Sequence, residues 1–263
     1  MSPILSIITV TFNARAVLEE TILSVLQQSF TNYEYWVIDG ESNDGTIDIA
    51  KKYSNKVNLI SEKDWGIYDA MNKGISKAKG QWIYFLNAGD TLFDNHVLQN
   101  IFETTIAEDV ALLHGNIKTK NHPSGSDYTQ GQSITLPDFY YRFWLCHQAV
   151  FTRRTAFDRI GTYNSRDYPV SADQEWFIRF LKAGGKALYI NRIIAHYEVV
   201  GESFLKRTQT HSEHLKMVET HFNWWIILQN KMCSPLVRLK IYLIQNYSTS
   251  KAYMLYRRLF YRD

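Results

Sequence analysis

Short polar runs follow the apolar stretches in the first part of the chain. Their oxygen-bearing side chains include Thr11, Asn13, Asp39, Asp64 and Asp90. Carboxylate and amide oxygens can hold a divalent cation, and carboxylates can also accept protons from a reacting group. Any one of these residues could instead cap a helix or a turn, as Asn and Asp often do. Several successive runs of this kind exceed what a structural sheet requires, so we expect a polar ligand site.

The segments between these runs predict the elements that position them. Apolar runs at 4–10, 33–38, 57–61 and 82–86 are typical of buried strands, and helical periodicity separates them. Asn13 is expected to cap the first helix. This alternation predicts an α/β fold with a mostly parallel sheet and helices on both faces. Ligands of such sheets bind at the carboxyl ends of the strands, where the polar runs lie.

The second half of the chain is less regular. We expect a strand at 110–114, a polar loop or hairpin at 121–137, a helix at 172–183 and a strand at 187–190. Beyond residue 203 the sequence is helical and aromatic to its end.

Composition and charge exclude several classes of protein. The 263 residues are 45% hydrophobic and carry a net charge of +3, which fits a globular domain and gives no reason to expect a nucleic-acid partner. Cys146 and Cys233 have no CxxC spacing, which argues against a zinc site and favours a cytoplasmic location. No apolar run approaches the roughly 20 residues of a membrane-spanning helix, and the first residues are interpreted as a strand and not a signal peptide.

Common phosphate-binding motifs are missing from the sequence. There is no GxGxxG after the first strand, and no GxxxxGK[ST]. A bound nucleotide would need its phosphates neutralised in another way. A metal ion held by Asp90 is the obvious candidate, because hard divalent cations prefer oxygen ligands.

Four stretches carry a resemblance to a known family. They are TVTFNARAVLEETILSVLQQSFTNYEYWVIDGESNDGT, SEKDWGIYDAMNKGISKAKGQWIYFLNAGD, HQAVFTRR and SADQEWFIRFLKAGG. In this order they resemble the opening, the donor segment and the acceptor half of family 2 glycosyltransferases with the GT-A fold, of the bacterial polysaccharide-biosynthesis type. The resemblance implies a catalytic domain over 1–205 and a helical, basic and aromatic extension over 206–263. Within the domain, the donor half would span 1–115 and the acceptor half 116–205.

The resemblance also implies a reaction. Such enzymes transfer a hexose with inversion from a nucleotide diphosphate sugar, commonly a UDP-sugar, to a hydroxyl of a glycan or lipid-linked acceptor. The residues that would bind the nucleotide sugar are Thr11, Phe12, Asn13, Asp39, Asp64, Asn72, Lys73 and Asn87. Among them, Asp39 would accept a hydrogen bond from the base.

The metal motif of the family is usually Asp-x-Asp, and here it reads Asn87-Ala88-Gly89-Asp90. The first carboxylate is thus an amide, and Asp90 would anchor Mg²⁺ or Mn²⁺ together with diphosphate oxygens and water. His196 follows a late strand, where many GT-A enzymes place a metal-binding histidine.

The family's catalytic base lies in a Glu-Asp pair at a helix start, and Asp173 matches its second member while Ala172 replaces the first. An inverting displacement needs one carboxylate to take the acceptor proton. The alternatives are that Asp173 is only a helix cap, or that Glu175 is the base. His147, Gln148 and Trp176 would lie on the acceptor or donor-sugar side, although His147 could also be a core residue.

Six basic residues and one acidic residue lie between 234 and 263, which leaves the rest of the chain slightly acidic. Apolar stripes beside Arg257 and Arg258 are typical of a helix on an anionic membrane surface, and would place the protein on the inner face of the membrane. The alternative is a helix that packs on its own domain or on a homodimer partner.

Two rival functions remain at this point. Asn87 and Ala172 stand where the family pattern has carboxylates. These replacements also fit a catalytically degenerate protein that binds a nucleotide sugar or acts as a scaffold. A nucleotidyltransferase is disfavoured, because the run after the first strand is neither Gly-rich nor basic.

Overall fold

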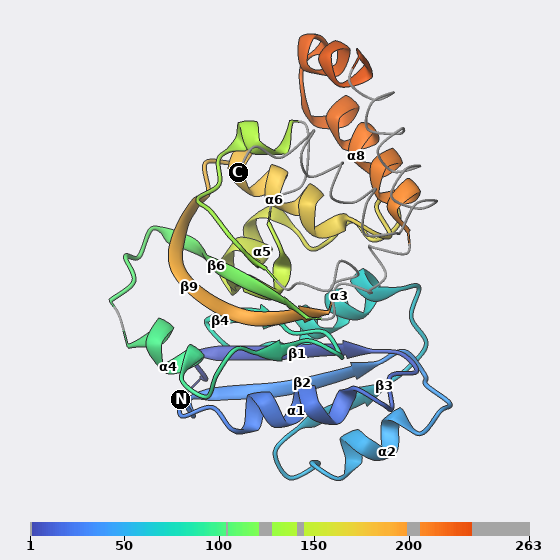
Figure 1. Cartoon of the computed structure of the whole chain (residues 1–263), viewed down its shortest axis with the longest axis vertical. Helices are drawn as coiled ribbons and strands as arrows, with labels where there is room; N and C mark the ends of the chain where they lie inside the picture. Colours follow the sequence, from blue (N-terminus) through green and yellow to red (C-terminus); the bar gives the residue numbers. More distant parts are fainter. Residues whose placement is uncertain (1, 104, 121–127, 141–144, 199–205, 233–263) are drawn as a thin grey trace.

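The computed structural model describes residues 2–103, 105–120, 128–140, 145–198 and 206–232. Its centre is a mixed sheet with the strand order β3-β2-β1-β4-β8-β6-β9-β5, and β7 pairs with β6 (Figure 1). The strands are β1 (Leu5–Thr11), β2 (Tyr33–Asp39), β3 (Asn58–Ser61), β4 (Trp82–Phe85), β5 (Thr91–Leu92), β6 (Val110–Lys120), β7 (Thr129–Gln130), β8 (Val150–Arg153) and β9 (Lys186–Glu198). The helices are α1 (Leu18–Leu26), α2 (Thr46–Lys51), α3 (Ile67–Lys77), α4 (Val97–Phe102), α5 (Arg154–Ile160), α6 (Ala172–Lys182) and α8 (Arg207–His221), with short 3₁₀ helices η1 (Leu136–Phe139) and η2 (His147–Ala149).

The half of the sheet nearest the N-terminus is parallel, as predicted. β1 pairs in parallel with β2 and β4, and β2 pairs in parallel with β3. The register sets Thr11 opposite Asp39, and Asp39 opposite Ser61. The polar ends of three strands therefore meet at one edge of the sheet.

Residues of β1 alternate between two cores, because successive side chains of a strand point to opposite faces. Leu5 and Ile7 pack in the cluster that contains residues of α1, α2 and α4. Ile8 and Val10 pack in the cluster that contains residues of α3, α5 and α6. Figure 1 shows the same two layers, with α1 and α2 on one side of the sheet and α3, α5 and α6 on the other. The predicted α/β fold with helices on both faces is thus confirmed.

Two strands are longer than the sequence indicated. β6 and β9 pair in parallel from Val110 and Lys186 to Lys120 and Glu198, with irregular register around Asn116. The polar residues within both strands, and the register shifts between them, break the two-residue periodicity by which a strand is recognised. The predicted strands at 110–114 and 187–190 are therefore only their first parts.

The predicted cap of the first helix is wrong. α1 begins at Leu18 with Val17 at the N-cap, and no side chain caps it. Asn13 instead has a φ of 48°, and its Oδ1 accepts a hydrogen bond from the Asn43 backbone N–H at 3.1 Å. A contact with the turn after β2 has taken the place of the local cap.

Helix α8 lies against α6 (Figure 1). In Figure 1 it runs beside α6, on the side away from the parallel strands. Lys182 on α6 donates to the His221 carbonyl at 2.6 Å, and Asn230 donates to the Tyr140 carbonyl at 2.7 Å. Within the described residues, no helix is long and apolar enough to cross a membrane. The amphipathic segment expected at 234–263 lies outside the described residues.

Candidate active site

Asp173, the predicted base, lies in the first turn of α6 and is 5% exposed. The Tyr68 hydroxyl donates to its Oδ1 at 2.6 Å, and the Gln174 amide donates to its Oδ2 at 2.9 Å. His147 Nδ1 lies 3.3 Å from the same Oδ2. A carboxylate can accept about four hydrogen bonds. These three contacts leave one acceptor position for an incoming proton.

His147 joins this carboxylate to the residues after β4. Its Nε2 lies 2.9 Å from Asn87 Nδ2, which is a donor. With this placement of the Asn87 amide, Nε2 accepts, and Nδ1 donates toward Asp173 Oδ2. Asn87 Oδ1 is buried and has no hydrogen-bond partner among the described residues.

Gln148 makes the equivalent contact with the predicted metal residue. Its Nε2 donates to Asp90 Oδ2 at 2.9 Å, and its Oε1 accepts from the Cys146 thiol at 2.7 Å. The Gln148 carbonyl accepts from the Tyr84 hydroxyl at 2.8 Å. The two successive residues of η2 therefore contact Asp173 and Asp90, which lie far apart in the sequence.

Asn87 and Asp90 provide oxygen atoms suited to a hard cation. Asp90 is 4% exposed, and Gly89 between them has a φ of 101° that turns the chain back. The register sets His196 opposite Thr91, directly after Asp90. Within the described residues, no group of three or more His, Cys, Asp or Glu side chains could hold a metal ion. A cation held by Asn87 and Asp90 would need most of its ligands from a bound molecule and water.

Asp39 is fully buried and organises the turn that follows β2. Its Oδ2 accepts from the Ser42 N–H at 2.9 Å and from the Ser61 hydroxyl at 2.7 Å, and its Oδ1 accepts from the Ser42 hydroxyl at 2.5 Å. Ser42 Oγ in turn accepts from the Asn13 N–H at 2.8 Å. One acceptor position of this carboxylate remains, which is compatible with the predicted contact to a base.

Phe12 and Asp64 approach the same turn from two sides. A Cβ added to Gly40 would lie 2.5 Å from Asp64 Oδ2 and 3.3 Å from Phe12 Cδ2, so a larger residue there would require the Asp64 side chain to shift. Burial raises the pKa of Asp64. Phe12 is 63% exposed, while the Thr11 hydroxyl is buried and has no partner among the described residues. The predicted nucleotide residues at these strand ends thus come together.

Asn72 and Lys73 on α3 have partners within the protein. The Asn72 amide donates to the Tyr163 carbonyl at 2.8 Å and accepts from the Tyr163 N–H at 3.0 Å. Lys73 Nζ lies 3.2 Å from Glu62 and donates to the Lys63 carbonyl at 2.5 Å. Asn72 thus fixes the loop at 163, whereas Lys73 lies beside the segment that carries Asp64.

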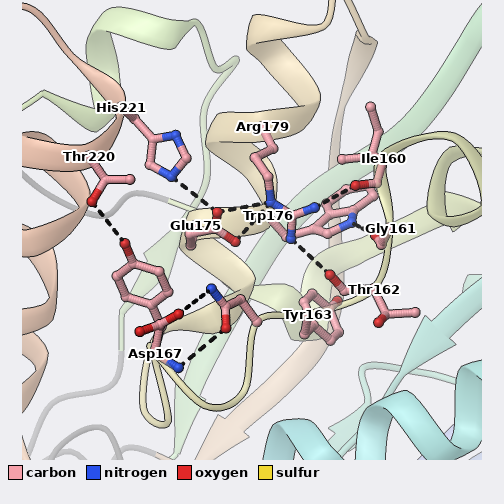
Figure 2. A network of polar contacts seen from close by, with 12 residues as sticks. Ile160, Gly161, Thr162, Tyr163, Asp167, Glu175, Trp176, Arg179, Thr220 and His221 are labelled. Carbon is pink, nitrogen blue, oxygen red and sulfur yellow. Dashed lines mark hydrogen bonds and ion pairs between the residues drawn. The ribbon is translucent and has the colours of Figure 1, made fainter.

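Trp176 was predicted to lie on the acceptor or donor-sugar side of the site, but its side chain is in the core. It is fully buried, stacks on Phe180 at a ring distance of 5.4 Å, and donates to the Gly161 carbonyl at 2.7 Å. Figure 2 shows its ring among the residues that hold the loop at 160–163. Its role is to pack α6.

Glu175, the fallback base, belongs to a structural network (Figure 2). It pairs with Arg179 at 2.9 Å and with His221 of α8 at 3.1 Å. Arg179 also donates to the carbonyls of Ile160 and Thr162 at 2.6 and 2.8 Å. Burial alone would raise the pKa of Glu175, but the hydrogen bonds from His221 and Arg179 outweigh it and lower that pKa.

Glu213 and Tyr68 are site residues that the sequence did not reveal. Glu213 on α8 is 5% exposed and accepts from the Val170 N–H at 3.2 Å and the Ser171 hydroxyl at 2.8 Å. It therefore fixes the backbone immediately before Asp173. Tyr68 lies in the second of the four stretches that carry the resemblance, but nothing in the sequence marks its role, and Glu213 lies outside all four. Each contacts a segment remote in sequence.

The fold and this site define an α/β protein whose parallel strands end in polar residues and whose helix α6 carries the buried carboxylate of Asp173 in its first turn. Residues 6–168 match the family described as Glycosyl transferase family 2, so the chain belongs to that family. A PGL/p-HBAD biosynthesis glycosyltransferase of Mycobacterium tuberculosis is 31% identical over 220 residues, covering 78% of this chain and 84% of the relative. TuaG of Bacillus subtilis, a putative teichuronic acid biosynthesis glycosyltransferase, is 26% identical over 76% of this chain and 81% of its own length.

Solved structures share the fold at low sequence identity. Staphylococcus aureus TarS 1–349 in complex with UDP has a TM-score of 0.65 at 18% identity, covering 82% of this chain and 64% of that fragment. The chain spans 38% of a longer TarS structure. The mannosyltransferase PcManGT of Pyrobaculum calidifontis, in complex with GDP-Man and Mn²⁺, has a TM-score of 0.65 at 13% identity, covering 100% of this chain and 89% of that protein.

The network around Glu175 predicts how stability depends on pH. Since the folded pKa is lowered, the stabilisation is complete above the ordinary value of 4.5 and is lost as the pH falls below it. Glu175→Gln should lower the free energy of unfolding by about 1.5–3 kcal/mol at pH 7, and by less at pH 4. Urea denaturation at both pH values measures this difference. Asp158→Asn, in the exposed pair with Arg154, is the control and should change little. A fully stable but inactive Glu175→Gln enzyme would instead make Glu175 the base.

Proposed function

We propose that the protein is an inverting glycosyltransferase that moves a hexose from a UDP-sugar to a hydroxyl of a glycan or lipid-linked acceptor in surface polysaccharide synthesis. The observation that carries this proposal is the pair of contacts from η2, His147 to Asp173 and Gln148 to Asp90. The names of the relatives from M. tuberculosis and B. subtilis support a cell-surface product. The UDP and UDP-GlcNAc complexes of TarS support a uridine donor.

In the proposed reaction the acceptor oxygen attacks the anomeric carbon as the bond to the diphosphate breaks. Asp173 takes the hydroxyl proton at the acceptor position that its three donors leave open. Tyr68 and His147 keep the carboxylate oriented, and Glu213 holds the backbone before it. A single base acting on the face opposite the leaving group gives inversion.

Mg²⁺ or Mn²⁺, when bound, would neutralise the charge that develops on the leaving diphosphate. Asp90 is its proposed anchor, and the buried Asn87 Oδ1 is a second oxygen ligand in place of the family's carboxylate. His196 is the third candidate, since its strand pairs with the residue after Asp90. Thr11, Phe12, Asp39 and Asp64 would then surround the nucleoside.

The rival function is a degenerate protein that binds a nucleotide sugar without turnover. It rests on Asn87 and Ala172, where the family pattern has carboxylates. The surroundings of Asp173 favour the enzyme, because a carboxylate with a buried tyrosine, amide and imidazole around it is costly to maintain without use.

We also propose that the protein binds an anionic membrane surface through 234–263 and the helical residues 224–232 that precede it. Trp224 and Trp225 are 70% and 55% exposed, and Met232 is 72% exposed. Asn230 anchors the opposite side of this helix to Tyr140. Exposed tryptophans suit the headgroup region, and the basic residues beyond them suit anionic lipids.

Replacement of the base tests the catalytic proposal. Asp173→Asn keeps the size and the contacts with Tyr68 but cannot take a proton, so turnover should fall by at least about 100-fold. UDP affinity, measured calorimetrically with Mn²⁺, should stay close to that of the wild type. An Asn variant that retains turnover would contradict the assignment of the base.

Asp90→Asn is the matched control in the same experiment. It should lose the Mn²⁺-dependent part of UDP affinity, which Asp173→Asn should retain. Equal Mn²⁺ dependence in both variants would exclude Asp90 as the metal anchor.

Vesicle co-sedimentation tests the membrane proposal. Two double variants, Trp224→Ser/Trp225→Ser and Arg257→Glu/Arg258→Glu, should each bind phosphatidylglycerol vesicles more weakly than the wild type. Neither variant should bind vesicles of pure phosphatidylcholine strongly. Leu23→Ser/Leu188→Ser removes two other exposed apolar side chains and should bind normally. Unchanged binding in both test variants would overturn the proposal, and a shift from dimer to monomer in light scattering would assign the surface to a second copy.

A further inference from the structure

Strand β9 passes beside Asp90, and its register shows which side chain faces that residue. β5 and β9 pair in antiparallel orientation, with Thr91 opposite His196. One step further along the same register sets Tyr197 opposite Asp90, which directly precedes β5. Directly opposed side chains lie on the same face of a sheet, with Cβ atoms about 5 Å apart. Tyr197 is therefore the residue of β9 that lies beside Asp90.

The packing of β9 agrees with this alternation of faces. The His196 ring contacts the Phe93 ring, at a distance of 5.1 Å between their centres. Successive side chains of a strand point to opposite faces, so Tyr197 shares the face of Ala195. Ala195 is fully buried in a core cluster against which Tyr197 and Cys146 also pack, and Cys146 directly precedes η2. The strand thus presents Tyr197, and not His196, to the candidate metal residue.

The electrostatics of Tyr197 place its hydroxyl near both carboxylates of the site. Burial is the main cause that raises the pKa of Tyr197 above the ordinary value of 10.0. The pKa is raised further by four neighbours: Cys146, Asp90, Tyr128 and Asp173. Interactions between charges fall off with distance, so the hydroxyl lies in the field of both carboxylates. It is neutral at physiological pH and can donate a hydrogen bond.

The Tyr197 hydroxyl makes no hydrogen bond with the residues that the structure describes. Two other tyrosines of the site are engaged within the protein. Tyr68 donates to Asp173 at 2.6 Å, and Tyr84 donates to the Gln148 carbonyl at 2.8 Å. A largely buried tyrosine hydroxyl usually has a partner, and Tyr197 is only partly exposed. Its donor therefore fits an oxygen atom of a bound molecule.

The position beside Asp90 indicates which oxygen atom this is. Asp90 is the proposed metal anchor, and the cation would bring the diphosphate of the donor to it. Hydrogen bonds to an ionised acceptor are about twice as strong as those between neutral groups. The negative charge on the diphosphate grows as its bond to the anomeric carbon breaks. A fixed donor at this point therefore stabilises the transition state more than the ground state.

We propose that Tyr197 donates a hydrogen bond to the diphosphate of the nucleotide sugar and stabilises it as it leaves. The proton stays on Tyr197 throughout, so the diphosphate leaves as an anion and Asp173 alone takes the proton of the acceptor. This contact rests on the proposed transferase function. Tyr197 lies outside the four stretches that carry the family resemblance.

Tyr197→Phe tests the contact, because it keeps the ring and its packing but removes the hydroxyl. Calorimetry on the full-length protein should show about tenfold weaker binding of UDP, as expected for one lost hydrogen bond to a charged group. The loss should be the same with Mn²⁺ and with EDTA. Uridine, which has no phosphate, should bind as it does to the wild type in an NMR titration. Tyr189→Phe is the control, since it removes another hydroxyl of β9, one that donates to Asn116 at 2.7 Å.

Three results would overturn the contact. They are wild-type UDP affinity in Tyr197→Phe, an equal loss of uridine affinity, and a loss of UDP affinity that appears only with Mn²⁺. Sugar release from UDP-sugars, measured on the same samples, separates this failure from that of the parent proposal. A protein that releases sugar while its UDP binding ignores Tyr197→Phe refutes the contact alone. One whose UDP affinity depends on Tyr197 but that releases no sugar refutes the transferase function alone, and a wild type that binds no UDP refutes both.

Discussion

Two adjacent residues hold the two buried carboxylates of the candidate site. His147 lies 3.3 Å from Asp173, and Gln148 donates to Asp90 at 2.9 Å. Asp90 follows the parallel strand β4, and Asp173 lies in the first turn of α6. A base can act only where its oxygen meets the proton within about 3 Å, so the relative position of the two halves must be fixed. The short helix η2 provides this fixed position.

Because the carboxylates of Asp90 and Asp173 are buried, the polar groups around them need hydrogen-bond partners within the protein. Asp173 is 5% exposed, and burial of a polar group is costly unless it is hydrogen-bonded. The donors to Asp173 come from α3, η2 and α6. From α8, Glu213 accepts from the Ser171 hydroxyl just before α6, and His221 pairs with Glu175. Although the sequence indicated a separate extension beyond residue 205, the contacts of α8 make it part of the support of α6.

The parallel strands, their polar ends and the helix at 172 could be predicted, because long apolar runs and parallel geometry follow from local sequence. The cap at Asn13 could not, since its partner Asn43 lies on another strand end. The role of Trp176 was misjudged because α6 is buried from Ala172 to Ile178 on all sides, so periodicity does not mark an exposed face. Tyr68 and Glu213 meet the site only through tertiary contacts, 105 and 42 residues away in sequence.

The proposed reaction is a direct displacement in which one carboxylate, Asp173, serves as base. The stereochemistry of the product tests it most directly. With an α-linked UDP-sugar and any acceptor that supports turnover, NMR of the anomeric proton during the first turnovers should show the β-linked product. An α-linked product would mean retention, which a single displacement cannot give, and would contradict the account.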